Sequence, residues 1–212
     1  MIASAKPAIL YHAPFTCSLA VRLAGRWGDV PLDIQPTPLG EQAPSDFTAH
    51  NPLAQVSTLI LPDDSILTET SACLIWVQSQ SQNPDFKRTA DQAEYFQMLR
   101  WIGFCATELH KQLLRIVFYD EATEDVKNNF RQLSKSRLQR LNDHLSDRNT
   151  LVGSTYSAAD AYLAWFLTLA PKAGADLSQY NSLSAFSDRV QNDKDLIFLL
   201  SDDTQIKASL SD

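Results

Sequence analysis

The order of short strands and helices in the first ~80 residues restricts the fold more than any other feature of this chain. Residues 8–12 (AILYH) form a short apolar run typical of a strand, and residues 17–27 (CSLAVRLAGRW) have the apolar periodicity of a helix. The stretch VPLDIQPT predicts a second strand, and VSTLILPDDSILT predicts a hairpin that turns at residues 63–65. Residues 70–80 (TSACLIWVQSQ) then predict a helix packed against a sheet.

This order favours a thioredoxin-like layer, and the pattern of the chain changes after it. The polar segment SQSQNPDFKR, with its proline, predicts a connection between two domains. Beyond it the apolar periodicity predicts long helices over residues 90–118, 121–145 and 157–169, followed by a less regular tail. We therefore expect an α/β plus all-α protein. Its thioredoxin-like domain would span residues 1–83 and its C-terminal helical bundle domain residues 84–212.

Composition and charge exclude several classes of protein. Hydrophobic residues make up 44% of the chain and charged residues 20%, and no apolar run approaches the ~18 residues that would span a membrane. The N-terminus lacks the long apolar core and the cleavage signature of a secretory signal, so we expect a cytoplasmic protein without a membrane partner. A formal net charge of −7, with basic residues scattered among acids, argues against nucleic acid as a partner.

The three cysteines are odd in number, far apart and without the spacing of a metal site. This disfavours a disulfide framework and structural zinc, and we predict no metal. Cys73 and Cys105 lie in apolar patterns and are interpreted as small buried hydrophobes. Cys17 stands where a helix begins, so the helix dipole and unpaired N–H groups would stabilise its thiolate. The alternative is an incidental cysteine at a helix cap with no chemistry.

Other polar residues have structural interpretations. Ser157 and Asp160 have the spacing of a capping box at the start of the helix that contains AYLAWFL, and we assign both to that cap. Three histidines, His12, His50 and His144, have no context that points to chemistry. We assign them to solvent or to local hydrogen bonds.

Four segments together resemble the glutathione transferases, most of all the bacterial beta class. They are YHAPFTCSLA, NPLAQVSTLILPDDSILTET, WIGFCATELHK and TYSAADAYLAWF, and the resemblance covers nearly the whole chain. It implies that the thioredoxin-like domain binds glutathione as a co-substrate, with no other cofactor, and that the helical domain supplies most of the pocket for an electrophile. It also implies a homodimer.

The resemblance implies roles for two residues at the sulfur of glutathione. Cys17 matches the beta-class cysteine that contacts that sulfur or couples to it covalently, and His110 matches the histidine that reaches it from the helical domain. Gly103, Ala106 and His110 also recur at helical spacing, so small residues lead to an imidazole and leave room for a ligand. Both residues are predicted to be catalytic.

The resemblance also implies a set of glutathione contacts. Glu69 and Thr70 match the acid and hydroxyl that hold the γ-glutamyl end, although a carboxylate at a helix start is favoured by the dipole whatever its function. Gln55 and Val56 match the segment that pairs with the main chain of the cysteinyl part. We add Ser18, a hydroxyl donor beside Cys17, and Lys111, which follows His110.

Two positions depart from the family pattern. Ser57 stands where the family has a proline with a cis peptide bond, and we expect the Val56–Ser57 bond to keep the cis form, a trans bond being the alternative. The segment QPTPLGEQ lacks the lysine that the beta class carries there, which removes a partner for the glycyl carboxylate.

We predict an enzyme, a glutathione transferase of the detoxification type, that joins glutathione to electrophilic, mostly apolar small molecules. One alternative is a glutathione-dependent thiol transferase or peroxidase that acts covalently through Cys17; no cysteine lies three residues away, so a second glutathione would have to release the adduct. Another is a catalytically weak binding or scaffold protein with the same fold, which the two departures would favour.

Overall fold

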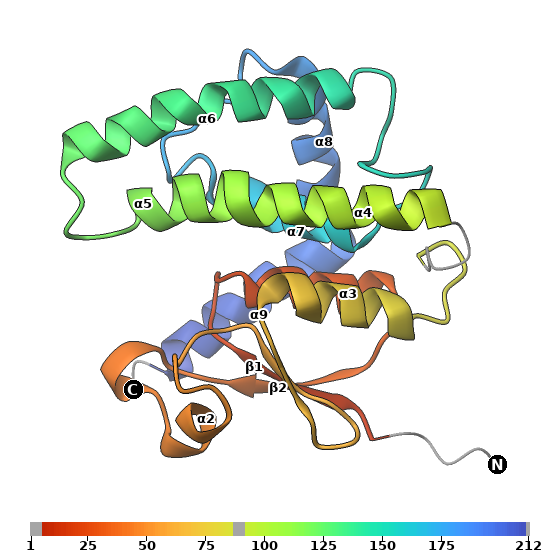
Figure 1. Ribbon diagram of the computed structural model, residues 1–212, viewed down its shortest axis with the longest axis vertical. Coiled ribbons are helices and arrows are strands. Elements are labelled where there is room, and N and C mark those ends of the chain that lie inside the picture. Colours follow the sequence, from red (N-terminus) through yellow and green to blue (C-terminus); the bar gives the residue numbers. More distant parts are fainter. Residues whose placement is uncertain (1–5, 87–91, 211–212) are drawn as a thin grey trace. The chain divides into compact units, whose positions relative to one another are not determined.

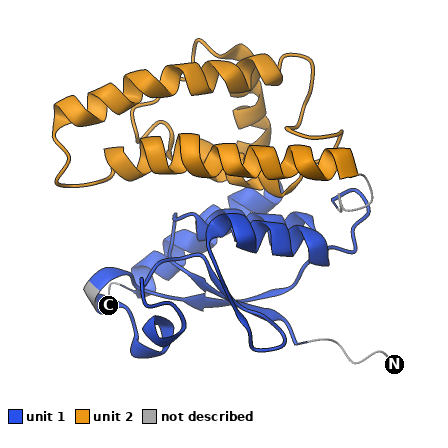
Figure 2. Ribbon diagram, in the orientation of Figure 1, with its two compact units in different colours: residues 1–87, 194–212 blue, residues 88–193 orange. Residues whose placement is uncertain are grey.

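The computed structural model describes residues 6–86 and 92–210, and these divide into two compact units. Unit 1 comprises residues 1–87 with 194–212, and unit 2 comprises residues 88–193 (Figure 2). The expected domain boundary after residue 83 lies four residues before the end of the first segment of unit 1 at residue 87. The end of the chain differs from the expected helical domain, because the last helix belongs to unit 1.

A four-stranded mixed sheet with the order β2-β1-β3-β4 forms the centre of unit 1 (Figure 1). The strands are β1 (Ala8–His12), β2 (Leu32–Pro36), β3 (Thr58–Ile60) and β4 (Ile66–Thr68). β1 pairs in parallel with β2 and antiparallel with β3, which pairs antiparallel with β4. Because β1 has a neighbour on each side, four of its five residues are buried, including the polar His12 at its end.

The helices of unit 1 are α1 (Ser18–Trp27), the short η1 (Gly40–Gln42) and α2 (Ser45–His50), α3 (Thr70–Gln80) and α9 (Lys194–Ser209). α1 packs against both α3 and α9 and buries its first eight residues, Ser18 to Gly25. The strands, α1 and α3 confirm the predicted thioredoxin-like order. The sequence analysis missed η1, α2 and α9, and it was wrong to expect an irregular tail.

Unit 2 is helical. It contains α4 (Gln92–Phe104), the π-helix η2 (Cys105–Leu114), α5 (Arg115–Val117), α6 (Glu124–His144), α7 (Ala158–Leu169) and α8 (Asn181–Gln191). The three predicted long helices are confirmed within the described residues, although the first contains an unexpected π-helical segment; its expected start at residue 90 lies outside them. α8 was not predicted.

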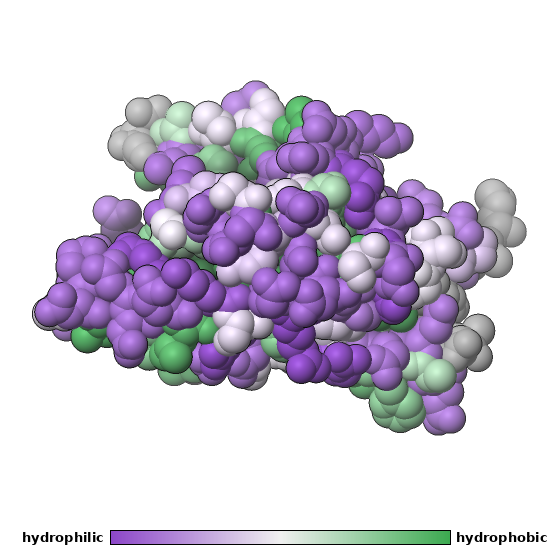
Figure 3. Space-filling model, turned by 90° about the horizontal axis from the view of Figure 1, so that it is seen from above, coloured by the Kyte–Doolittle hydropathy of each residue, from purple (hydrophilic) through white to green (hydrophobic). Residues whose placement is uncertain are grey.

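α6 and α7 have opposite surface characters. α7 buries ten consecutive residues, Ala158 to Leu167, as expected for a central helix that is apolar on all sides. α6 buries only Ser134, Leu138 and Leu141, and the surface seen from above is largely hydrophilic (Figure 3). α7 therefore forms the core of unit 2, and α6, which packs against η2, α5 and α8, faces solvent.

The predicted capping box begins α7. Ser157 is the N-cap, and its side chain and main chain exchange hydrogen bonds with Asp160 three residues on. Asp160 Oδ2 accepts from Ser157 N at 2.9 Å and from Ser157 Oγ at 2.6 Å, and Oδ1 accepts from Leu151 N at 2.7 Å. The structural interpretation of both residues is confirmed.

Candidate active site

Cys17 lies at the junction of the central strand and the first helix. β1 ends at His12, and residues 13–17 lead into α1, of which Cys17 is the N-cap. The Cys17 thiol donates a hydrogen bond to the carbonyl oxygen of Val56 at 3.2 Å. The residue is 7% exposed. The structure thus places Cys17 and Val56, two predicted site residues, in direct contact.

The other two cysteines are buried in different surroundings. Burial, with smaller contributions from Cys17 and Glu69, raises the pKa of Cys73 to about 12. Burial also raises the pKa of Cys105, with a smaller effect of Asp160. Thiols held in the protonated form are poor nucleophiles. Their interpretation as buried hydrophobes is confirmed.

The loop before β3 is fixed by hydrogen bonds to its main chain. Asn51 Nδ2 donates to Gln55 O at 2.7 Å and to Thr58 Oγ1 at 3.0 Å, and that hydroxyl also donates to Gln55 O at 3.0 Å. The Val56–Ser57 peptide bond is cis, as expected. The Gln55 side chain is exposed, so it faces solvent from an ordered backbone.

Glu69 and Thr70, the predicted contacts of the γ-glutamyl end of glutathione, lie at the start of α3. Glu69 is the N-cap, with φ 70° and ψ 125°, an uncommon conformation for a residue with a side chain. Backbone strain of this kind is found disproportionately at binding sites. Thr70, 6% exposed, has its Oγ1 3.2 Å from Ser57 Oγ. Ser57 therefore joins the Val56 loop to the start of α3.

Ser18 requires a correction. Its side chain is fully buried, and its Oγ lies 2.8 Å from His12 Nδ1 and 2.9 Å from Thr16 Oγ1. The hydroxyl serves an internal network, so a ligand could meet Ser18 only through its main chain. The assignment of His12 to solvent or local bonds was also wrong, because its other nitrogen contacts Asp203, 191 positions away.

His110 lies in η2 of unit 2 and contacts the central helix α7. Its Nδ1 is 2.9 Å from the hydroxyl of Tyr162, and its ring meets Trp165 edge-on, with 4.7 Å between centroids. Burial, assisted by the positive charges of Lys111 and Arg115, lowers the pKa of His110 to about 4. The imidazole is therefore uncharged at neutral pH.

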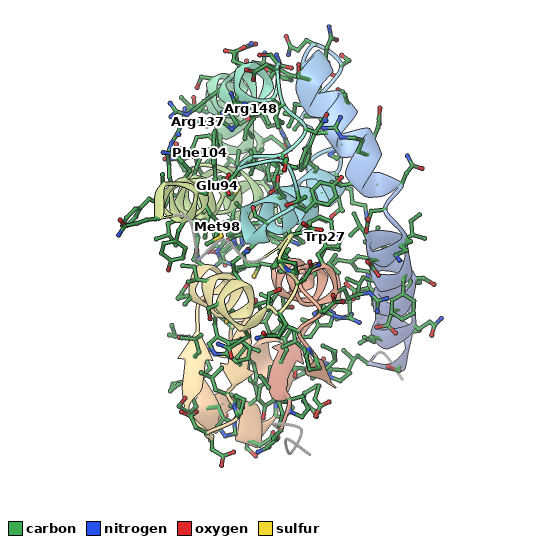
Figure 4. The ribbon with its side chains drawn as sticks, turned by 90° about the vertical axis from the view of Figure 1, so that its right-hand side faces the viewer. Trp27, Glu94, Met98, Phe104, Arg137 and Arg148 are labelled. Carbon is green, nitrogen blue, oxygen red and sulfur yellow. The ribbon has the colours of Figure 1, made fainter. Side chains whose placement is uncertain are left out.

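The π-helical segment around His110 is braced from α6. Arg137 Nε donates to Glu108 Oε2 at 3.0 Å, and Arg137 Nη2 donates to Gln112 Oε1 at 3.2 Å. Figure 4 labels Arg137 and also Phe104, the residue that precedes η2. π-helical turns are rare and frequent at functional sites. Lys111, the neighbour of His110, has an exposed side chain.

Sequence reasoning missed three contacts of the predicted site residues, one in unit 2 and two in unit 1. They are Tyr162 beside His110, Ser57 beside Thr70, and Asn51 under Gln55. Tyr162 lies in the apolar run AYLAWFL, where a tyrosine is ordinarily a core residue. The tyrosine hydroxyl was the signal that could have revealed this contact, because a buried tyrosine usually has a hydrogen-bond partner.

Within residues 6–86 and 92–210, no group of three or more histidine, cysteine or acidic side chains is arranged to hold a metal ion. None of the helices in that same part of the chain has the length and apolarity needed to cross a membrane.

The fold and site define a class: proteins in which a thioredoxin-like layer carries a cysteine at its first helix and is joined to a helical unit. Residues 104–193 match the family described as "Glutathione S-transferase, C-terminal domain". Glutathione S-transferase GST-4.5 of Xanthomonas campestris is 30% identical over 197 residues, covering 88% of this chain and 94% of the relative. The chain belongs to the glutathione S-transferase family.

Solved structures agree with this assignment. The beta class glutathione S-transferase of Sphingomonas chungbukensis is 27% identical, with a TM-score of 0.81, covering 92% of this chain and 98% of that one. A sphingomonad glutathione S-transferase solved in complex with glutathione shares the fold at a TM-score of 0.84 and 24% identity, with 92% and 98% covered. The chain resembles the bacterial beta class of its family.

Proposed function

We propose that this protein is a cytoplasmic glutathione transferase that joins the sulfur of glutathione to an electrophilic carbon of small, mostly apolar molecules. The observation that carries the proposal is the placement of Cys17 at the N-terminus of α1, in contact with Val56, in a chain of this family. The helix dipole and terminal N–H groups favour an anionic sulfur there, whether that of Cys17 or of bound glutathione. A thiolate is the nucleophile that the reaction needs.

The remaining assignments in unit 1 concern the rest of glutathione. The main chain of Gln55 and Val56 pairs with the cysteinyl part of glutathione. Hydrogen bonds from Asn51 and Thr58 to the Gln55 carbonyl oxygen hold the loop in place for this pairing. Glu69 and Thr70 hold the γ-glutamyl ammonium and carboxylate, whose charges suit an exposed acid and a hydroxyl at a helix start.

From the family resemblance we propose that His110 is a neutral hydrogen-bond donor to the sulfur. When its Nδ1 accepts from the Tyr162 hydroxyl, the ring proton sits on Nε2 and points away from that bond. A neutral imidazole donor stabilises a thiolate without itself titrating near pH 7. Lys111, exposed beside it, adds positive charge for the anionic ligand.

A homodimer is part of the same proposal and follows from the family resemblance. Sedimentation at micromolar concentration should give twice 23.7 kDa, whereas a species of 23.7 kDa alone would contradict it.

Covalent use of Cys17 is the second candidate, favoured by the thiol itself at the helix start. A mixed disulfide with glutathione would have no partner in Cys73 or Cys105, which are buried and protonated, so a second glutathione would release it. Mass spectrometry of protein trapped during turnover separates the two, since only the covalent route passes through a disulfide between Cys17 and glutathione.

The test combines calorimetric titration of glutathione with a rate assay on an activated aryl halide. We expect binding in the wild-type chain, and a rate reduced at least about tenfold by His110→Asn but not by the matched control His144→Asn. Millimolar or absent binding would favour the scaffold alternative and reject the proposal.

A further inference from the structure

A buried polar network surrounds the end of β1 and has no part in the proposed chemistry. Its centre is His12, fully buried, whose two ring nitrogens both have partners. Nδ1 lies 2.8 Å from Ser18 Oγ, and Nε2 lies 2.8 Å from Asp203 Oδ1. The network thus joins the last residue of β1 to the first residue of α1 and to α9, near the end of the chain.

Asp203 is the acceptor on which the network converges. It is 0% exposed, and besides His12 it accepts from Arg22 Nη1 at 2.6 Å and from the main-chain N–H of Phe15 at 2.6 Å. A buried carboxylate is costly unless several donors satisfy it. Here two side chains and one backbone amide do so, which fixes the carboxylate and the amide relative to one another.

Arg22 supplies the positive charge. It lies within α1, is 5% exposed, and donates through Nη2 to Asp202 as well as through Nη1 to Asp203. One guanidinium therefore bridges two neighbouring carboxylates of α9. A second ion pair between the same helices, Arg26 Nε to Asp195 Oδ1 at 2.7 Å, lies nearer the start of α9.

The network anchors the loop on both sides of Cys17. Asp203 holds the amide of Phe15, two residues before the cysteine, and His12 holds the hydroxyl of Ser18, one residue after it. Phe15 has φ 62°, a conformation that side-chain-bearing residues seldom adopt, so its backbone needs such a restraint. Thr16 ties the loop together by donating to Ala13 O at 2.7 Å.

We propose that Asp203 is a positioning residue for Cys17. Through Phe15 directly, and through His12 and Ser18, it holds the Cys17 loop so that the sulfur lies at the N-terminus of α1 and opposite the Val56 carbonyl. The inference rests on the proposed function only in taking Cys17 as the residue beside the ligand sulfur. If Asp203 only joined α9 to α1, its loss would affect the Cys17 loop no more than the loss of another ion pair between these two helices.

The test compares Asp203→Asn with Asp195→Asn. Both remove one carboxylate from the α1–α9 ion pairs, but only the first touches the Cys17 loop. In hydrogen–deuterium exchange of the whole chain, we expect the peptide that contains Phe15 and Cys17 to exchange about tenfold faster in Asp203→Asn and unchanged in Asp195→Asn. Calorimetry should show glutathione binding weakened about tenfold by Asp203→Asn alone.

The outcomes separate the two proposals. Loop exchange that is unchanged in Asp203→Asn, or accelerated equally by both variants, would overturn the positioning role whatever the ligand. A wild-type chain that fails to bind glutathione would reject the proposed function while the exchange data still decide this inference. Should Asp203→Asn not fold, His12→Gln keeps a group near Asp203 but loses the bond to Ser18. Faster loop exchange in that variant supports the role, and unchanged exchange contradicts it.

Discussion

Titration of His110 will show whether its surroundings in unit 2 keep the imidazole uncharged at neutral pH. The ring packs edge-on against Trp165 and shares a hydrogen bond with Tyr162. Burial first, and then Lys111 and Arg115, lower its pKa from 6.5 to about 4. A histidine in the unfolded chain keeps a pKa near 6.5.

The sign and size of the effect on stability follow from this difference. Since the folded pKa lies below the unfolded one, the unfolded chain binds more protons between pH 6.5 and 4. The contribution of His110 to the free energy of unfolding is therefore complete above pH 6.5, and it is lost as the pH falls toward the folded pKa. From pH 7 to pH 5 the contribution of His110 to the free energy of unfolding falls by about 2 kcal/mol.

Two measurements check this prediction. Nuclear magnetic resonance of the histidine ring protons between pH 4 and 8 gives the pKa, with the His110 signal assigned by its absence in His110→Asn. Thermal unfolding at pH 7 and pH 5 gives the stability change, which should be about 2 kcal/mol smaller in His110→Asn than in the wild type. His144→Asn is the control, because burial also lowers the pKa of His144, whose Nε2 lies 2.9 Å from the carbonyl oxygen of Leu151. A His110 signal that titrates near pH 6.5 would refute the argument.

Three further predictions concern other parts of the two units. Iodoacetamide should label Cys17 in native protein well before Cys73 and Cys105, which are fully buried and held protonated; equal rates at all three would contradict it. Thr70→Val should weaken glutathione binding about tenfold in calorimetry with little change in melting temperature, and unchanged affinity would exclude a ligand role for this hydroxyl. Asp160→Ala should lower the free energy of unfolding by roughly 2 to 4 kcal/mol, because three hydrogen bonds to a buried carboxylate are lost, and a change below about 0.5 kcal/mol would count against it.

Local patterns allowed most of the fold to be predicted from the sequence. The strands, α1, α3 and the capping box of α7 depend on residues within a few positions of one another, so periodicity and spacing reveal them. α2 was missed because its six residues, SDFTAH, contain one buried side chain. α8 carried an available signal, since Leu183, Phe186 and Val190 recur at helical spacing.

The candidate site could be predicted only where its chemistry is local. Cys17 was found because a thiol at a helix start is visible in a short stretch of sequence. The neutral state of His110 was not, because it depends on burial against Trp165 and on a bond to Tyr162, more than fifty positions away. The π-helix around it gave no periodic signal of its own.

Asp203 illustrates how long-range polar contacts can still be inferred from a sequence. α9 presents Leu196, Leu199 and Asp203 on its buried face, so an acid occupies a position that helical spacing assigns to the core. An ionised carboxylate at such a position requires buried donors from another element. Two other polar residues occupy core positions. Arg22 lies on the buried side of α1, and His12 ends an otherwise apolar strand. Polar residues that interrupt apolar patterns in separate elements therefore predict one shared network, and here that network holds the loop that carries Cys17.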